Sequence, residues 1–215
     1  QGNSMPFAKW TCYDNGLQSA MVVRWPGKVK AGSVSSAMIE YVDVTPTFVD
    51  LAGGLEFSEW DGRSFANVLF GKATHHKDLV FGMMTTNGIN NGNDSYPIRS
   101  IRSRTYKLII NLQHDQAFRN ACTESPEFQS MVRAANDGSS SARKVVDRYQ
   151  FRPAIEFYDV VNDPYEMTNV ADQPEFADTI KKLRDQLEIW MKSQGDQGIQ
   201  TEQVARQRQR RKRRQ

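Results

Sequence analysis

The chain has 215 residues, of which 39% are hydrophobic and 10% aromatic, a composition typical of folded globular proteins and unlike that of disordered ones. Its formal charge of +3 comes from the last fifteen residues, which hold seven Lys or Arg residues against one acid, so that residues 1–200 carry −3. This balance argues against a general nucleic-acid-binding surface, and the lack of an apolar run of about eighteen residues argues against a membrane span. Two cysteines, Cys12 and Cys122, are too few for a disulfide framework, and their pairing is left open beside a simple packing role.

The first part of the chain predicts a strand followed by short helices. Residues 20–25 form an apolar run that ends in a Pro-Gly turn, as a buried strand does. Residues 45–52 predict a helix with Thr45 as its N-cap and Pro46 in its first turn. Residues 61–71 predict a loop followed by one or two helical turns.

The middle of the chain has the pattern of strands. Residues 78–84, residues 96–112 and the segment 154–166 are rich in β-branched and aromatic residues. The Gly/Asn-rich stretch 87–94 predicts a loop between the first two. Residues 113–150 are polar and predict a loop with some helix.

The last clear element is an amphipathic helix. Asp172 as N-cap and Glu175 three residues later form a capping box, with a proline in the first turn. Apolar residues then recur at helical spacing as far as Ser193, which indicates a helix packed on a core. The Gln/Arg/Lys-rich residues 194–215 are expected to be disordered.

These elements predict an α/β fold with a small second part. We expect residues 1–74 to be the end of a larger α/β unit, and residues 75–193 to be an α+β subdomain. That subdomain would be an antiparallel sheet covered by the C-terminal helix. Residues 194–215 would form a basic tail.

The residues alone do not reveal a complete active site. His75 and His76 are adjacent and so share neither a helix face nor a strand face, and His114 stands alone, so a metal site at any of them is not expected. No nucleophile elbow, phosphate-binding loop or zinc motif occurs.

Several stretches of the sequence resemble a known protein family, and this resemblance indicates a function that residue spacing alone does not. The stretches PFAKWTCYDNGLQSAMVVRWPG, VDVTPTFVDLAG and DGRSF are similar to the C-terminal half of the sulfatase family of the alkaline-phosphatase-like superfamily. The stretches SYPIRSIRSRTYKLIINL and FYDVVNDPYEMTNV further resemble the N-sulfoglucosamine sulfohydrolases (heparan N-sulfatases) and related bacterial sulfatases. The resemblance covers roughly residues 1–193 and implies a sulfatase whose fold is completed by an N-terminal half.

The resemblance implies site residues at the start of the chain. Sulfatases use a formylglycine made from a Cys or Ser in a Cys/Ser-x-Pro/Ala-x-Arg motif, and neither Cys12 nor Cys122 has that context. We therefore expect the nucleophile to lie in a missing N-terminal half and the isolated chain to be inactive. Gln1 matches a family ligand to Ca²⁺, a cation that favours oxygen donors. Lys9 matches the family lysine that contacts the sulfate and offsets charge during bond cleavage.

Specificity is expected to depend on the loop before the second strand region. Asn90, Asn91 and Arg99 are candidates for binding sugar hydroxyls or a carboxylate, since Arg is a planar two-pronged donor. The alternative is a structural role for all three. Sulfamidases carry histidines just before this Ser-Tyr-Pro segment, whereas this chain has Asn-Gly-Asn-Asp there.

The leading hypothesis is a sulfatase that acts on a sulfated sugar, heparan-type N-sulfoglucosamine first. The alternatives are a non-catalytic module that binds polyanions or sulfated glycans, and a phosphodiesterase or phosphonate hydrolase of the same superfamily. The family implies a periplasmic or secreted protein. The basic tail is either a solvated extension or a binding arm for anionic polysaccharide, nucleic acid or a membrane surface.

Overall fold

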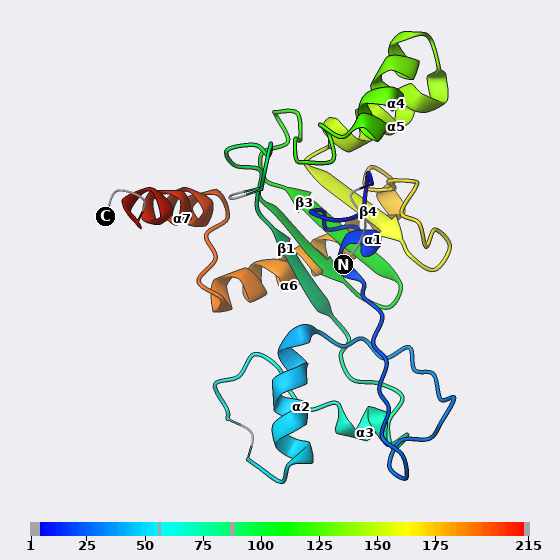
Figure 1. Cartoon of the computed structure of the whole chain (residues 1–215), viewed down its shortest axis with the longest axis vertical. Coiled ribbons are helices and arrows are strands. Elements are labelled where there is room, and N and C mark those ends of the chain that lie inside the picture. Colours follow the sequence, from blue (N-terminus) through cyan, green and yellow to red (C-terminus); the bar gives the residue numbers. More distant parts are fainter. Residues whose placement is uncertain (1–4, 56, 87–88, 213–215) are drawn as a thin grey trace. The chain divides into compact units, whose positions relative to one another are not determined.

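The computed structural model describes residues 5–55, 57–86 and 89–212, with side chains as far as Ala205. The chain divides into two compact units (Figure 1). We call Gln1–Ser19 with Phe81–Gln215 the sheet unit, and Ala20–Val80 the loop unit. Residues 5–19 belong to the sheet unit, and the domain boundaries expected from the sequence stay a prediction.

The sheet unit is built on four strands, which lie side by side in chain order. They are β1 (Val80–Met84), β2 (Ile98–Arg102), β3 (Tyr106–Asn111) and β4 (Ile155–Asp159). β3 pairs antiparallel with both β2 and β4, and Leu108 at its centre lies opposite Ile101 on one side and Phe157 on the other. The predicted antiparallel sheet is therefore confirmed, as are its three strand regions.

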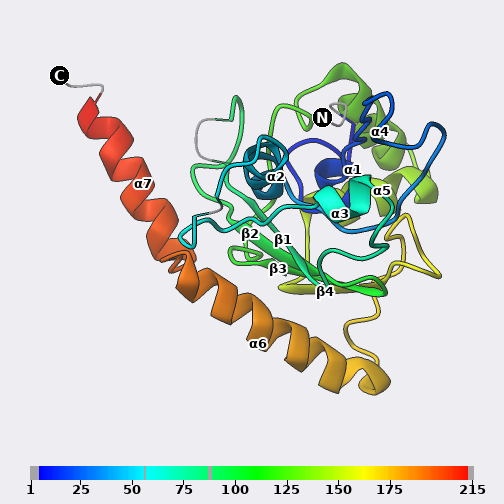
Figure 2. The same cartoon turned by 90° about the horizontal axis from the view of Figure 1, so that it is seen from below.

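One face of the sheet is covered by α6 (Ala177–Ser193), as Figure 2 shows. Leu183 and Leu187 of this helix are buried, and Trp190 stacks on Phe81 with ring centroids 4.8 Å apart. The predicted amphipathic helix is thus confirmed. Its predicted capping box is wrong, because a 3₁₀ turn (Pro174–Phe176) precedes α6 and no side chain caps either element.

The other face is covered by the first residues of the chain and by a helical hairpin. The N-terminal segment ends in α1 (Asp14–Leu17), and the hairpin consists of α4 (Pro126–Asn136) and α5 (Ser140–Gln150). The Ser125 and Ser139 hydroxyls accept backbone hydrogen bonds at the two helix starts, which is why these polar stretches become helical. The region predicted as a loop with some helix is therefore largely helical.

A continuous hydrophobic core lies between the sheet and these segments. Cys12 and Cys122 are both free and buried in it, so their packing role is confirmed and they form no disulfide. Its largest buried side chains are aromatic. They are Tyr13, Tyr96, Phe118, Phe128, Tyr149 and Tyr158.

The chain continues past α6 into a further helix, α7 (Ile199–Lys212). Residues 194–215 were expected to be disordered, and α7 corrects this for the described part. Its start is fixed to the sheet unit, because Glu202 is buried and forms an ion pair with Arg99 of β2 at 3.3 Å. No helix in the described part of the chain has the length and apolar character needed to cross a membrane.

The loop unit contains little regular structure. Its elements are a 3₁₀ turn (Tyr41–Asp43), α2 (Val44–Leu51) and α3 (Ala66–Leu69). Both predicted helical regions are confirmed, although the residue before α2 is Asp43, and Thr45 lies inside the helix. The strand predicted at residues 20–25 is absent, and these residues are exposed and irregular.

A buried carboxylate organises the loop unit. Asp43 accepts hydrogen bonds from the backbone N–H groups of Glu40 (2.8 Å) and Arg63 (3.0 Å) and pairs with Lys77 Nζ at 2.8 Å. Burial opposes its ionisation, but these hydrogen bonds hold the pKa of Asp43 below its ordinary value. His76 Nε2 lies 3.3 Å from the same carboxylate, and burial lowers the pKa of His76 despite that charge. His76 therefore has a structural partner.

Candidate functional site

Lys9 lies on a strained turn at the surface of the sheet unit. Its side chain is exposed, with Nζ 4.8 Å from the ring centroid of Trp10. Phe7 and Trp10, on either side of it, have φ angles of 63° and 66°, in the left-handed region that bulky residues avoid. Such strain costs about 1–3 kcal/mol per residue and persists only where surrounding contacts enforce it.

Short-range contacts enforce this conformation. The Thr11 hydroxyl donates a hydrogen bond to the carbonyl oxygen of Ala8 at 2.6 Å. The ring of Phe7 meets the rings of Tyr13 and Tyr149 edge-on, with both centroid distances 5.2 Å. Gly16 allows the chain to pass close by, because a Cβ atom there would overlap with the Ala8 carbonyl. The turn that carries Lys9 is therefore held from its own backbone and from the core.

A buried ionic network anchors the residues that follow Lys9. Lys107 Nζ on β3 lies 2.7 Å from Asp14 and 2.8 Å from Glu166, and Arg102 Nε donates to Asp14 at 3.0 Å. Glu166 also accepts a hydrogen bond from the backbone N–H of Asp14 at 2.7 Å. Burial opposes ionisation of Asp14, yet Lys107 and Arg102 hold its pKa below the ordinary value. Burial raises the pKa of Glu166, which Lys107 only partly offsets.

A second buried carboxylate anchors the neighbouring tyrosine. Glu156 on β4 accepts hydrogen bonds from the Tyr13 hydroxyl and the Tyr158 hydroxyl, both at 2.6 Å, and from Asn111 at 2.7 Å. Burial and the Glu156 charge raise the pKa of Tyr13 well above its ordinary value. The Tyr13-Asp14 pair is thus fixed to the sheet by two separate carboxylate clusters.

Sequence reasoning identified Lys9 but missed the groups that hold it. Lys107 and Glu156 are charged residues at buried positions of otherwise apolar strands. In the register of the sheet, Lys107 lies opposite Tyr158 and Glu156 opposite Ile109. A charge on the inward face of a predicted strand is a signal that could have indicated a buried ionic network.

The predicted substrate-binding residues differ in exposure. Asn90 and Asn91 are exposed in the loop before β2, and Asn91 has a φ of 57°, which Asn tolerates well. Ile89 of this loop packs against the same core as Phe7 and Trp10. The role of Asn90 and Asn91 in substrate binding stays a prediction. The Ca²⁺ ligand predicted at Gln1 lies outside the described residues.

Arg99 does not offer its guanidinium to a ligand. The side chain is fully buried, with Nε 2.5 Å and Nη2 3.1 Å from the two carboxylate oxygens of Asp196. A further ion pair joins it to Glu202. The predicted sugar contact is therefore replaced by a structural role, because the donors that would bind the sugar are occupied by the start of α7.

The described side chains contain no group of three or more His, Cys, Asp or Glu residues that could hold a metal ion. The role of Ca²⁺ stays a prediction. His75 and His114 are exposed.

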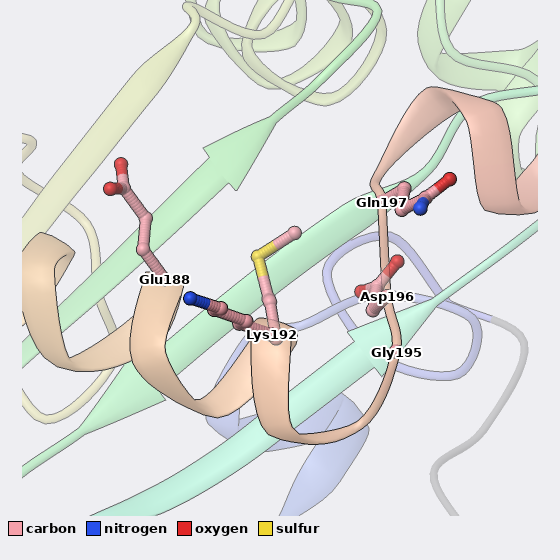
Figure 3. A pocket seen from close by; sticks show the side chains of 6 residues that line it. Glu188, Lys192, Gly195, Asp196 and Gln197 are labelled. Atoms are coloured by element: carbon pink, nitrogen blue, oxygen red, sulfur yellow. The ribbon is translucent and has the colours of Figure 1, made fainter.

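Two hollows lie near the connection between α6 and α7. The first, of about 290 Å³, is formed by the end of α6 and the following link, and Figure 3 shows Glu188 and Lys192 of α6 beside Asp196 and Gln197. The second, of about 260 Å³, lies between the loop before β2, the segment after β3 and the first turn of α7. Its lining residues are Asp94, Ser95, Gln113, Gln116, Glu202 and Gln203. Neither hollow contains a nucleophile paired with a base, so neither is a reaction site by itself.

Comparison with known proteins identifies the family. The family profile described as "N-sulphoglucosamine sulphohydrolase, C-terminal" matches residues 2–133. An ulvan-active sulfatase of Formosa agariphila is 34% identical over 87% of this chain and 36% of its own length. The human N-sulphoglucosamine sulphohydrolase is 29% identical over 87% of this chain and 39% of its own length.

A solved structure supports the same fold. The chain matches a protein whose structure is titled as a complex with its substrate D-glucosamine-2-N,6-O-disulfate, with a TM-score of 0.54 and 24% identity. The match covers 79% of this chain and 27% of that one. The chain thus spans little more than a third of the curated relatives, and its mixed helix and antiparallel-sheet fold is the C-terminal part of an alkaline-phosphatase-like fold. These matches show that the chain belongs to the sulfatase family, in the group defined by the C-terminal region of N-sulphoglucosamine sulphohydrolases.

Proposed function

We propose that this chain is the C-terminal part of a longer sulfatase that removes sulfate from a sulfated saccharide, with an N-sulfated glucosamine unit as its first substrate. The matching family profile and the human relative carry the same substrate in their names. The solved structure that shares this fold is titled as a complex with its substrate, D-glucosamine-2-N,6-O-disulfate. Activity belongs to the longer protein, because its relatives are more than twice as long as this chain.

A second substrate has its own support. The ulvan-active sulfatase is more similar to this chain than the human enzyme is, at 34% against 29% identity over the same share of the chain. Ulvan is therefore the alternative substrate.

The strained turn around Lys9 is the observation that carries the proposed chemistry. A lysine ammonium at a fixed position can stabilise negative charge on sulfate oxygens as the bond to sulfur breaks. Two left-handed aromatic residues and two buried carboxylate clusters fix the backbone around Lys9.

The remaining groups are proposed for the longer protein only. Its N-terminal region would supply the formylglycine nucleophile and most of the oxygen ligands for Ca²⁺, with Gln1 as a further ligand. The periplasmic or secreted location is proposed from the family alone.

The exposed apolar residues of the loop unit support an N-terminal partner. Val22 and Val34 are 92% and 97% exposed, and Trp25, Phe48 and Leu55 are exposed as well. Among the described residues, ten large apolar side chains are exposed within residues 20–80, more than the scattered single ones of an ordinary surface. We propose that the N-terminal region of the longer protein covers these residues.

The test is sulfate release by the longer protein. Lys9→Ala should lower kcat by about 10²- to 10³-fold, the usual cost of one oxyanion-stabilising group, with Lys9→Arg retaining part of the activity. Lys28→Ala, which removes an exposed lysine of the loop unit, is the control and should leave kcat unchanged. Unaltered sulfate release by Lys9→Ala would contradict the assigned role. The isolated 215-residue chain should release no sulfate.

Substrate class is decided by the same assay. Sulfate release from 2-N-sulfated glucosamine, from its 6-O-sulfated isomer and from ulvan oligosaccharides is compared at equal concentrations. Preference for the N-sulfated sugar supports the first substrate, and preference for ulvan supports the second. Hydrolysis of phosphodiesters but of no sulfated sugar would remove both.

A further inference from the structure

The described turns of α7 carry an unusual density of positive charge. Four arginines and one lysine fall among the seven residues 206–212, and the same stretch contains no acid and no aromatic residue. These seven residues span about 10 Å of helix. This stretch of sequence lacks the apolar stripe by which a helix packs on a core.

The root of α7 is fixed to the sheet. Arg99 of β2 holds Asp196 through two hydrogen bonds and Glu202 through a third, and Glu202 also accepts a hydrogen bond from the Thr85 hydroxyl. Burial opposes ionisation of Asp196, but the hydrogen bonds from Arg99 and from the backbone N–H of Gly198 hold its pKa below the ordinary value. The basic turns therefore leave the sheet unit at a defined place, and both views show α7 extending away from the sheet (Figures 1 and 2).

The hollow of about 260 Å³ lies at this root. Amide and hydroxyl side chains form most of its lining, with Gln203 contributed by α7 itself. Two buried atoms of the lining, Ser95 Oγ and Gln113 Oε1, make no hydrogen bond within the described residues. Buried polar atoms are costly unless they are paired, so this lining suits a ligand that carries hydroxyl groups.

Helix geometry connects the hollow to the charge. Positions 203, 206 and 210 of an α-helix lie on one face, because residues three and four apart are neighbours. Arg206 and Arg210 therefore continue the face that Gln203 begins at the hollow. Positions 208 and 211 lie on other sides of the helix.

We infer that this face of α7 and the hollow at its root form an accessory binding site for a sulfated polysaccharide. The arginines would pair with sulfate groups, and the amides of the hollow would hydrogen-bond with sugar hydroxyls. A lipid surface fits poorly, since an interfacial helix needs an apolar face, and single-stranded nucleic acid fits poorly, since its sites use aromatic stacking. The choice of polymer rests on the proposed function, and the binding itself does not require turnover.

The test measures binding of heparin octasaccharide to the 215-residue chain by calorimetry at several salt concentrations. R206Q/R210Q should weaken binding by about tenfold or more at 0.15 M salt and reduce the salt dependence by about one to two counterions. R208Q/R211Q is the matched control, since it removes the same charge from the same helix, and it should weaken binding by no more than about threefold. Equal losses in the two variants would overturn the inference, because they would show attraction by net charge alone.

The hollow is tested separately. Gln113→Ala should weaken octasaccharide binding severalfold with an unchanged salt dependence, and circular dichroism checks that the variant is folded. Unchanged binding by folded Gln113→Ala would overturn the role of the hollow. Duplex DNA that binds as tightly as the octasaccharide would overturn the choice of polymer. If the 215-residue chain does not bind the octasaccharide while the longer protein releases sulfate, the accessory site is rejected and the proposed function stands.

Discussion

The two units bury their side chains in different ways. In the sheet unit, aromatic residues and charged groups are both enclosed, so that Tyr149 and Phe118 lie in the same core as the clusters around Lys107 and Glu156. In the loop unit, a single buried carboxylate, Asp43, gathers its neighbours, while large apolar side chains remain exposed. Among the described residues, ten large apolar side chains are exposed in the short loop unit, against nine in the much longer sheet unit. A region that cannot bury its own apolar residues is one built to contact another.

The largest effect on the free energy of unfolding is expected in the aromatic core of the sheet unit. Phe118 is fully buried, with its ring against those of Tyr96 and Tyr149. Phe118→Ala should lower the free energy of unfolding of the sheet unit by about 3–5 kcal/mol, the cost of removing a buried ring and leaving a cavity. Urea unfolding followed by NMR signals of each unit measures it.

The control is a phenylalanine of the loop unit. Phe48 is 67% exposed on α2, and Phe48→Ala should change the free energy of unfolding by less than about 0.5 kcal/mol. Similar losses of stability in the two variants would show that the two units bury their aromatic residues to the same extent.

The buried ionic network should give the next largest effect. Lys107→Met removes the cation shared by Asp14 and Glu166, which leaves Glu166 without a cation while Asp14 keeps Arg102. We expect a loss of about 3 kcal/mol in the free energy of unfolding, because unpaired buried charges are strongly destabilising. Adding Glu166→Gln should restore part of it.

An exposed ion pair provides the contrast. Arg184 and Glu188 pair at 3.2 Å on the surface of α6, and Arg184→Met should cost less than about 0.5 kcal/mol. If Lys107→Met cost no more than Arg184→Met, the network would not be what anchors the segment after Lys9.

These anchoring residues also mark the limit of what the sequence could predict. The strands at 78–84 and 96–112 and the helix ending at Ser193 were correctly predicted, because their apolar periodicity reflects burial within the same unit. The strand at 20–25 was wrong because a strand needs a paired neighbour, and none is present among the described residues. The order of α7 and the burial of Arg99 were missed because they depend on each other across nearly a hundred residues. Only the resemblance, and no local pattern, indicated Lys9.

The pH dependence should separate the units by sign. Burial lowers the folded-state pKa of His76 below 6.5, so the unfolded chain takes up protons first as the pH falls. The loop unit should therefore lose stability as the pH falls from about 6.5 to 5, and further below 3.8 as the depressed pKa of Asp43 is passed. His76→Gln should flatten the slope between pH 6.5 and 5.

The sheet unit should respond in the alkaline range instead. Burial raises the pKa of Cys12 from 9.0 to about 11 and that of Tyr96 from 10.0 to about 12. A raised folded-state pKa means that stability is present below the unfolded value and is lost as the pH rises through the folded one. Urea unfolding is measured at pH 5, 7 and 10.5. The free energy of unfolding of the loop unit should be lower at pH 5 than at pH 7, and that of the sheet unit should be lower at pH 10.5. A common pH profile for both units would contradict the assignment.

The smallest effect is expected at the exposed apolar residues, and it depends on the length of the protein. Val22 is 92% exposed in this chain, so Val22→Ser should change its free energy of unfolding by less than about 0.5 kcal/mol. In the longer sulfatase, the same substitution should cost about 2 kcal/mol, because the N-terminal region would bury the valine. Urea unfolding of both forms measures the difference, with Ser33→Ala as a neighbouring exposed control. An equally small effect in the longer protein would mean that this surface faces solvent there too, and the apolar excess of the loop unit would then need a different partner.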